Sequence, residues 1–330
     1  MALILVTGAD GFIGQHLCVC LGQEHKVRRS VRRHALENEC LPVEAIGEID
    51  AATDWTSALA GVEVVVHAAA RVHIMKEKDA DPTAQFHRVN AAGSLNLARQ
   101  AAKAGVRRFI FLSTIKVNGE QNVAGQPFSA SDRPAPEDPY ALSKYAAEIG
   151  LQGLGVETGM EIVIIRPPLV YGVGVKGNFA TLIHLLEKRV PLPFGAIHNK
   201  RSLVGVDNLT DLIATCIWHP AAANQVFLAA DGEDLSTSEL LRRLAQALGK
   251  SALLLPVPVV VLEFGAKVLG KQAVAQRIFG SLQVDICKTQ DVLGWTPPVS
   301  VDEGLRRAVS LNTHGLRNRE RNQVAGRGNS

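Results

Sequence analysis

The stretch Ala2-Leu3-Ile4-Leu5-Val6-Thr7-Gly8-Ala9-Asp10-Gly11-Phe12-Ile13-Gly14, close to the start of the chain, decides the fold. An apolar run of strand length leads into a glycine-rich turn, and a helical pattern begins near Phe12. Gly8 permits a tight turn, Gly11 lets the backbone approach a pyrophosphate, and Gly14 lets the helix pack closely on the strand. The unpaired N–H groups at the helix N-terminus favour phosphate. The stretch therefore predicts a dinucleotide-binding strand, turn and helix.

Apolar runs then alternate with helical patterns. The strands expected after the first lie near residues 26–32, 43–49, 62–68, 108–113 and 161–166, and helices near 82–104 and 139–157. This alternation predicts an α/β fold, a doubly wound parallel sheet of the Rossmann type, with ligands off the carboxyl ends of its strands.

The pattern changes from Tyr171 onward. We expect a helix near residues 179–188, and a strand at 202–206, a helix at 208–218 and a strand at 225–230 that return to the large sheet. This division predicts three parts: a dinucleotide-binding domain at 1–170 plus 202–230, a smaller C-terminal substrate-binding lobe at 171–201 plus 231–315, and a flexible tail at 316–330.

Composition narrows the class of protein. The 330 residues are 47% hydrophobic, enough for a large core, and 35 basic against 32 acidic residues leave a net charge of only +3, which does not indicate nucleic-acid binding. Five cysteines without metal-ligand spacing predict reduced thiols, a cytoplasmic location and no metal site. The most apolar stretch, 253–262, contains Pro256 and Pro258, so no membrane span is expected.

Tyr140 and Lys144 stand four residues apart in a predicted helix. Residues at this spacing share a helix face, so the ammonium group can favour the phenolate and lower the pKa of Tyr140 from its usual value of about 10. A phenol tuned in this way can exchange a proton with an alcohol or ketone during hydride transfer. A solvated Tyr–Lys pair is the alternative when the spacing is taken alone.

Together these motifs resemble those of the extended short-chain dehydrogenase/reductase family, of the NAD-dependent epimerase/dehydratase type. The likeness covers roughly residues 1–312. It rests on Thr7 to Gly14, His67-Ala68-Ala69-Ala70, Asn90, Ser113-Thr114, Tyr140 with Lys144, and Arg166-Pro167-Pro168. The resemblance implies a catalytic set of Thr114, Tyr140 and Lys144.

Within the family the chain looks most similar to bacterial reductases of UDP-4-keto-6-deoxy-N-acetylhexosamines. That likeness rests on Arg71-Val72-His73, on the segment from Ser113 to Glu120 and on Gly280 to Asp285. It implies reduction of a C4 ketone to a 4-hydroxy sugar for surface polysaccharide synthesis. A 4-epimerase of UDP-hexoses or UDP-N-acetylhexosamines, which uses the same catalytic residues, and a reductase of a non-sugar ketone remain alternatives. Dehydration is disfavoured, because Ile115-Lys116 stands where dehydratases have Asp-Glu.

The second strand favours NADP(H), with NAD(H) as the alternative. Residues 27–33 contain four arginines and no acid, and an arginine can grip a 2′-phosphate that an acid would repel. Arg32 is the first candidate and Arg33 the second, and a solvated basic edge is the alternative. The resemblance adds further cofactor contacts at Gly8, Gly11, Phe12, Ile13, Gly14, Glu48, Ile49, Ala68, Ala69, Ala70, Asn90, Ser113, Tyr140, Lys144 and Pro167.

The substrate diphosphate needs cationic partners. By resemblance Arg201 and Arg277 are the candidates, and Asn178-Phe179 would contact the sugar nucleotide at the lobe boundary. Arg71, His73, Lys116 and Asn118 complete the expected substrate contacts, although Asn118 departs from the tyrosine that many family members have there. UDP is the favoured nucleotide, and a homodimer is left open.

Overall fold

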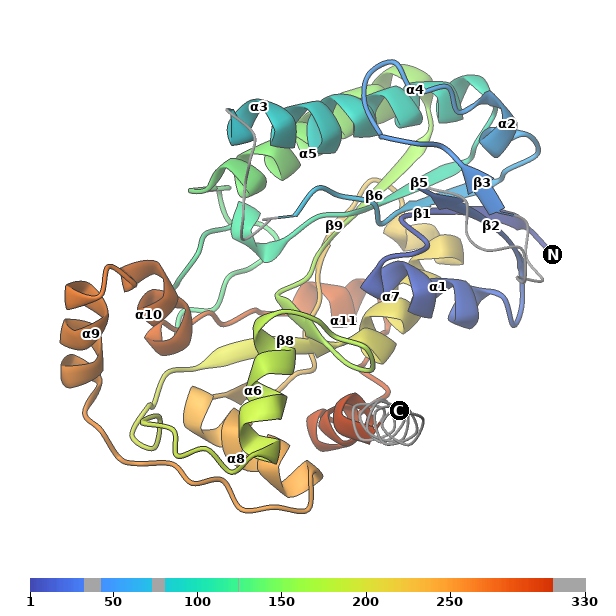
Figure 1. Ribbon diagram of the computed structural model, residues 1–330. Coiled ribbons are helices and arrows are strands. Elements are labelled where there is room, and N and C mark those ends of the chain that lie inside the picture. The colour runs from blue at the N-terminus through green and yellow to red at the C-terminus, as the bar shows by residue number, and fades with distance from the viewer. Residues whose placement is uncertain (33–42, 73–80, 124, 311–330) are drawn as a thin grey trace, which may run out of the picture.

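The computed structural model describes residues 1–32, 43–72, 81–123 and 125–310, and Figure 1 shows their arrangement. A seven-stranded sheet runs in the order β3-β2-β1-β4-β5-β6-β9, with every neighbouring pair parallel. Its strands are β1 (Leu3–Thr7), β2 (Lys26–Val31), β3 (Val43–Ala45), β4 (Val64–His67), β5 (Arg108–Leu112), β6 (Glu161–Arg166) and β9 (Val226–Leu228). The predicted doubly wound parallel sheet is confirmed.

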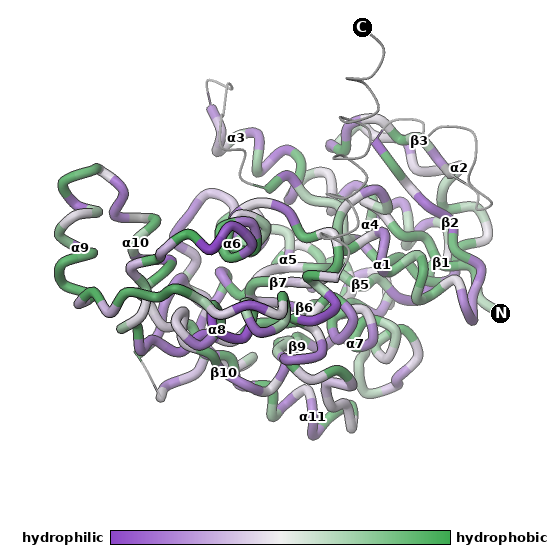
Figure 2. Tube along the Cα trace, turned by 60° about the horizontal axis from the view of Figure 1, so that its bottom comes forward, coloured by the Kyte–Doolittle hydropathy of each residue, from purple (hydrophilic) through white to green (hydrophobic). Residues whose placement is uncertain are grey.

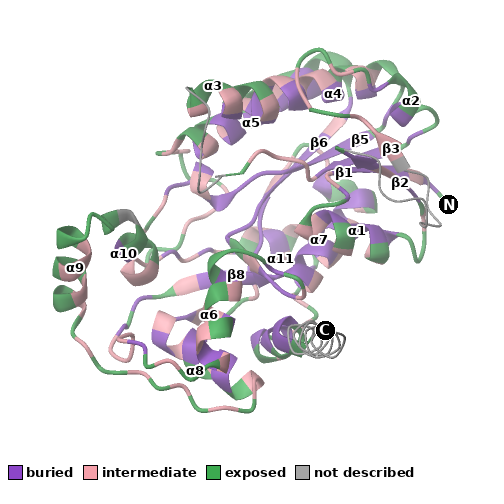
Figure 3. Ribbon diagram, in the orientation of Figure 1, coloured by how far each residue is buried: buried purple, intermediate pink, exposed green. Residues whose placement is uncertain are grey.

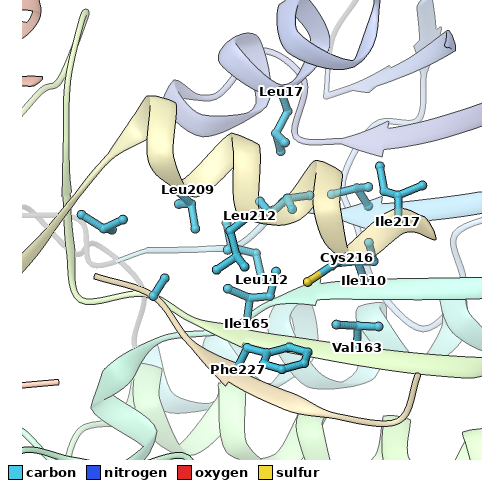
Figure 4. Packing of buried hydrophobic residues seen from close by; sticks show 14 of the residues in the cluster. Leu17, Ile110, Leu112, Val163, Ile165, Leu209, Leu212, Cys216, Ile217 and Phe227 are labelled. Atoms are coloured by element: carbon cyan, nitrogen blue, oxygen red, sulfur yellow. The ribbon is translucent and has the colours of Figure 1, made fainter. Parts of the chain in front are cut away.

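Helices cover both faces of this sheet (Figure 1). One face carries α1 (Phe12–Leu21) and α7 (Val206–Trp218); the other carries α4 (Ser94–Lys103) and α5 (Pro139–Thr158), with the short α2 (Thr56–Leu59) beside them. Alternate residues of one strand serve the two cores, because side chains alternate across a sheet. Thus Ile110 and Leu112 pack toward α7 (Figure 4), and Phe109 and Phe111 pack toward the α4–α5 side.

A second sheet holds the strand that we expected to return to the large one. β8 (Arg201–Gly205) pairs with β7 (Leu169–Tyr171) and β10 (Asp234–Leu235), in the order β10-β8-β7. The expectation for residues 202–206 was therefore wrong. A short strand buried along its length carries no signal of which sheet it joins, because that depends on pairing with distant segments. The helix at α7 and the strand at β9 do return to the large sheet, and the two-domain division itself stays a prediction.

Two further helices, α6 (Asn178–Glu187) and α8 (Thr237–Ala247), share a core with the small sheet. α9 (Val259–Val268) and α10 (Gln272–Phe279) pack against each other, and α11 (Cys287–Leu293) packs against β9 of the large sheet. Figure 3 shows that α9 is exposed over much of its surface. Within the described residues, no helix combines the length and apolar composition needed to cross a bilayer. The predicted tail at 316–330 lies outside the described residues.

One carboxylate joins the two sheets. Asp231 accepts hydrogen bonds from the Tyr171 hydroxyl at 2.7 Å, from the Gly205 N–H at 2.9 Å and from the Asn208 amide at 2.7 Å. These partners come from the end of β7, the end of β8 and the start of α7. Three passages of the chain between the sheets therefore meet at one side chain.

Candidate active site

The glycine-rich turn between β1 and α1 has the geometry that a dinucleotide requires. Gly8 has φ +65°, and an added Cβ there would lie 2.8 Å from the Cα of Ala69, in the loop after β4. A Cβ on Gly14 would lie 2.0 Å from the Gly8 carbonyl oxygen. A Cβ on Gly11 would meet only that same oxygen within 4 Å, so the space beside this backbone is open. α1 begins there without a side-chain cap, which leaves its N-terminus free for phosphate.

An uncharged chain of hydrogen bonds fixes the end of β4 beside this turn. The Nδ1 atom of His67 lies 2.7 Å from the Thr7 hydroxyl, and its Nε2 atom lies 2.8 Å from the Ser94 hydroxyl. Ser94 donates to the Asn90 carbonyl, so His67 is best assigned as a donor at Nε2 and an acceptor at Nδ1. Burial, with the Lys144 charge adding, lowers the pKa of His67 to about 3. This chain holds Ala68 to Ala70 next to Gly8.

Asn90 bridges two parts of the site. It lies in the π-helix His87–Gly93, which joins α3 (Pro82–Phe86) to α4. Its amide pairs with the backbone N–H and carbonyl of Arg71, at 2.8 and 3.0 Å, and donates to the Ser143 hydroxyl at 3.0 Å. Asn90 thus connects the loop after β4 to α5, between Tyr140 and Lys144. A cofactor contact for Asn90 stays a prediction.

α5 places Tyr140 and Lys144 beside the carboxyl end of β5. Asp138 caps the helix through its bond to the Ala141 N–H, and Pro139 occupies the first turn. The buried Lys144 ammonium donates to the Leu112 carbonyl at 2.7 Å and lies 4.3 Å from the centre of the Phe111 ring. The Tyr140 ring, half-buried, lies edge-on to Phe86. Asp138 is a residue that sequence reasoning missed, although Asp before Pro at a helix start is a capping signal.

The pKa of Tyr140 is shifted opposite to our expectation. Burial raises the pKa of Tyr140, and the nearby Asp138 carboxylate raises it further. Burial also lowers the pKa of Lys144 to about 7, against the opposing effect of Glu148. The spacing of Tyr140 and Lys144 indicates only the attraction between phenolate and ammonium, whereas burial adds the cost of desolvating both groups.

Thr114 follows β5 directly. Its extended backbone places it before the 3₁₀ turn Ile115–Val117, and its hydroxyl accepts from the Lys116 N–H at 3.3 Å. Because the Thr114 oxygen is the acceptor in this bond, its hydroxyl hydrogen is left to donate to another group. Pro167 lies behind it, because its carbonyl accepts from the Ile115 N–H at 2.9 Å.

A buried ionic network, which we call the interior network, lies behind α5. Glu148 accepts two hydrogen bonds from Arg166, at 3.0 and 2.5 Å, and one from the Ser113 hydroxyl at 2.5 Å. Arg166 also donates to Asn118, whose amide donates to the Ser129 carbonyl. Asn118 is buried in these contacts, so the structure does not support the predicted substrate contact. Glu148 was missed; its position four residues after Lys144 was the available signal.

A second cluster, the rim cluster, lies at the start of α5. The Lys116 ammonium donates to Asp138 at 2.5 Å and to Glu120 at 2.7 Å. Burial alone would raise the pKa of Asp138, but hydrogen bonds from Lys116 and the Ala141 N–H lower it overall. The ammonium is engaged with two carboxylates, so this placement gives Lys116 an internal partner instead of the predicted substrate contact.

Some of the residues expected to contact the adenosine half of the cofactor lie within the described residues. Arg32 is exposed just past β2. Glu48 forms a 3.5 Å ion pair with Arg88, and Ile49 packs against the α4 side of the core, where a Cβ on Gly93 would lie 2.7 Å from its Cγ2 atom. Arg33, and His73 among the predicted substrate contacts, lie outside the described residues. These contacts stay predictions.

The candidate substrate residues fall into two environments. Arg201, half-buried at the start of β8, donates to the Gly280 carbonyl at 2.9 Å and has no ion pair within the described residues. Arg201 is partly buried, and this burial lowers the pKa of its guanidinium. Arg277 and Asn178 are exposed, whereas the Phe179 ring is buried and stacks on Tyr171. Only the backbone of Phe179, in the first turn of α6, can meet a ligand.

Comparison with known proteins places this site in a family. A model of the NAD dependent epimerase/dehydratase family matches residues 4–230. The chain belongs to this family. It is 50% identical to a UDP-glucose 4-epimerase of Vibrio cholerae over 309 residues, which are 93% of this chain and 94% of that relative. Membership shows an enzyme family that is described as NAD dependent, and the role of Tyr140 stays a prediction.

Solved structures show the same architecture. The UDP-glucose 4-epimerase of Thermotoga maritima, solved with UDP-glucose, superposes with a TM-score of 0.75 at 25% identity and covers 95% of this chain and 99% of its own. The UDP-glucuronic acid 4-epimerase of Bacillus cereus, solved with NAD, gives 0.74 at 24% identity over 92% of this chain and 96% of its own. The second likeness shows the fold alone.

These comparisons overturn the reductase expectation. The relative at 50% identity is an epimerase, and the family alternative of 4-epimerisation is the one that the comparisons favour. The segments used for the reductase likeness, such as Ser113 to Glu120, contribute Ser113, Lys116 and Asn118 to internal contacts that either chemistry can use. The preference for NADP(H) gains no support either, since the family whose model the chain matches is described as NAD dependent.

Proposed function

We propose that this protein is a 4-epimerase of UDP-hexoses, or of their N-acetyl forms, that works with a retained NAD. The observation that carries the proposal is the 50% identity to a UDP-glucose 4-epimerase along nearly the whole of both chains. The site supports it, because Thr114, Tyr140 and Lys144 follow the ends of β5 and the start of α5, next to the glycine-rich turn.

Tyr140 and Thr114 manage the proton at the sugar O4. Bound NAD would supply the hydride chemistry at C4, as acceptor during oxidation and as donor to the opposite face of the sugar during reduction. During oxidation the O4 proton passes to the Tyr140 oxygen while Thr114 donates a hydrogen bond to O4, and the same proton goes back when the ketone is reduced. No net oxidation of the sugar results.

Lys144 controls the charge on this path. Its side chain is held between the Leu112 carbonyl and the Phe111 ring, and its pKa near 7 lets it change protonation at neutral pH. Tyr140, with a raised pKa, needs a nearby positive charge to ionise. The state in which Lys144 is charged is therefore the one in which Tyr140 can act as a base.

Arg201 is the proposed diphosphate partner. Its guanidinium is partly desolvated yet bonded only to a carbonyl among the described groups, so a phosphate would supply its missing counter-charge. Arg277 is a second candidate with weaker support, because it is exposed on α10. UDP is the proposed nucleotide by analogy with the T. maritima structure.

NAD is the proposed cofactor, although Arg32 would also suit the 2′-phosphate of NADP. An epimerase returns its hydride to the sugar, so exchange with a reduced cofactor pool is not needed. The fit rests on the open backbone at Gly11 and the uncapped N-terminus of α1. Acid release of the bound cofactor followed by mass measurement distinguishes NAD from NADP.

A homodimer through α5 completes the proposal. Leu142, Ile149 and Val156 are exposed and recur every seven residues, so they form one apolar stripe on this helix. Two such stripes could pack against each other as α5 of one protomer on α5 of its partner.

The test is epimerisation without added cofactor. Purified protein given UDP-glucose or UDP-N-acetylglucosamine should form the C4 epimer, measured by chromatography. The absorbance of reduced nicotinamide should show no net change during this conversion. Tyr140→Phe should reduce kcat by about 10²- to 10⁴-fold, because it removes the proton acceptor and little volume. NAD should remain bound to this variant.

Tyr145→Phe is the matched control, since Tyr145 lies on the same helix. It should keep kcat close to that of the wild type. Conversion of a 4-keto sugar with stoichiometric NADPH oxidation and no epimerisation would contradict the proposal, as would full activity of Tyr140→Phe.

A further inference from the structure

The segment 253–279 carries an exposed apolar surface that the fold does not use. Of the seventeen large hydrophobic residues that are exposed in the described part of the chain, eight fall within residues 253–274. They are Leu253, Leu255, Val260, Val261, Phe264, Val268, Leu269 and Val274. α9 contains no buried residue and stands at the outer end of the small lobe, as a mostly apolar tube in Figure 2. We call α9 and α10 with their connections the apolar arm.

The exposed residues of α9 gather on one face of the helix. At about 100° per residue, Val260, Val261, Phe264 and Val268 lie within an arc of about 100°. Their exposed fractions are 75%, 58%, 68% and 71%. The opposite side, which includes Leu262 and Ala266, is only half-exposed and carries the packing against α10. The outward apolar face therefore contributes nothing to the internal core of the arm.

Positive charge borders this face. The segment 253–279 contains Lys267, Lys271 and Arg277 against the single acid Glu263, which gives +3 − 1 = +2. Lys267, in the last turn of α9, and Lys271, just beyond it, form no ion pair within the described residues. An apolar helix face edged by unpaired lysines is the pattern of a helix that lies in the interface of an anionic bilayer.

We infer that the apolar arm binds an anionic lipid surface, with the outward face of α9 among the acyl chains and Lys267 and Lys271 at the headgroups. A second copy of this chain fits the face less well. A two-fold contact would place the two Lys267 side chains on the same small patch, where they would repel each other. A lipid surface instead supplies both apolar volume and the missing negative charge.

The position of the apolar arm determines which side of the molecule would face the bilayer. The arm ends at Gly280, whose carbonyl accepts the hydrogen bond from Arg201, the proposed diphosphate partner. The large sheet and its helices lie away from α9 in Figure 1. A bilayer at α9 would thus adjoin the substrate side of the molecule and leave the dinucleotide side in water. This inference does not depend on which reaction the site performs.

Co-sedimentation of the full chain with vesicles tests the inference. Wild-type protein should pellet with vesicles of phosphatidylcholine mixed with phosphatidylglycerol, and less with phosphatidylcholine alone. Val260→Ser combined with Phe264→Ser should weaken binding to the mixed vesicles at least tenfold. Lys267→Gln combined with Lys271→Gln should weaken it on mixed vesicles and leave binding to neutral vesicles unchanged.

The matched control is Val19→Ser combined with Val123→Ser. These residues are 71% and 67% exposed, similar to the replaced pair, and lie outside the arm, so this variant should bind as the wild type does. Far-ultraviolet circular dichroism confirms folding of all variants. No binding of the wild type to mixed vesicles, or equal binding by every variant, would overturn the inference. A wild-type oligomer that the Val260/Phe264 variant alone loses in sedimentation would assign the face to a second copy and overturn it as well.

Discussion

The interior network and the rim cluster both fasten α5, yet they differ in how completely they leave water. The Arg166 and Glu148 side chains are 5% and 2% exposed, whereas Lys116 and Asp138 are 28% and 29% exposed. The first cluster joins α5 to β5 and β6 from behind, and the second joins the start of α5 to the turn after Thr114. α5 is therefore held by a buried ion pair at Glu148, one turn after Lys144, and by a half-exposed ion pair at Asp138, two residues before Tyr140.

Because the two clusters differ in exposure, they should affect different properties of the protein. A buried ion pair whose lone pairs and N–H groups are all hydrogen-bonded is costly to break, because removal of one partner leaves the other charge buried without a counter-ion. A half-exposed pair is worth about 1 kcal/mol or less, since water can replace either partner. The rim cluster, however, sets the charge next to Tyr140. We therefore expect the interior network to govern the unfolding free energy and the rim cluster to govern the pH dependence.

The largest effect is expected from Glu148→Gln. Removal of the carboxylate charge leaves the Arg166 guanidinium buried without a counter-ion, and the unfolding free energy should fall by about 3–5 kcal/mol. Urea unfolding followed by circular dichroism measures it. Glu157→Gln, on an exposed position of the same helix, is the control and should change little. A loss of unfolding free energy below about 1 kcal/mol for Glu148→Gln would contradict the expectation that the interior network contributes more to stability than the rim cluster.

The uncharged chain through His67 sharpens the comparison, because it is buried and neutral. The folded-state pKa of His67 is lowered to about 3, below the unfolded value near 6.5. Between these two values the unfolded state binds a proton at His67 and the folded state does not. The contribution of neutral, buried His67 to the unfolding free energy is therefore present above pH 6.5 and is lost as the pH falls toward 3. Between pH 6.5 and 5 the loss should reach about 2 kcal/mol.

Denaturant unfolding across this pH range measures the slope. His67→Gln should lower stability at pH 8 but remove the extra loss below pH 6.5. His87→Gln, at an exposed position, should retain the wild-type slope. A wild-type slope that persists in His67→Gln would assign it to other groups.

The smallest effect on stability, but a visible one on activity, is expected from Lys116→Met. Without Lys116 the Asp138 carboxylate acts unopposed on Tyr140 and should raise its pKa further. The rise of kcat/KM with pH should then move to higher pH by up to about one unit, while the unfolding free energy changes by about 1 kcal/mol or less. Lys103→Met, an exposed residue of α4, is the control. An unmoved pH profile would show that the rim cluster only caps the helix.

The sequence predicted local features better than distant pairings. The turn at Gly8 to Gly14 could be predicted because the three glycines stand between an apolar strand and a helical pattern, whereas the triplet alone would indicate only a tight turn. Helix α5 and the facing of Tyr140 and Lys144 followed from spacing alone. The sheet to which β8 belongs and the interior position of Asn118 depend on contacts with distant residues, such as Tyr171 and Arg166. The raised pKa of Tyr140 depends on burial, which no spacing reveals.

The junction at Asp231 bears on the order in which the chain is made. During synthesis from the N-terminus, β7 and β8 leave the ribosome before α7 and β9, so part of the small sheet exists before the large one has its last strand. The side chain that joins the three passages comes later still. Nascent chains that end before Val226 therefore leave the edge of β6 unpaired, and the Asp231 carboxylate that joins the two sheets is added only after β9.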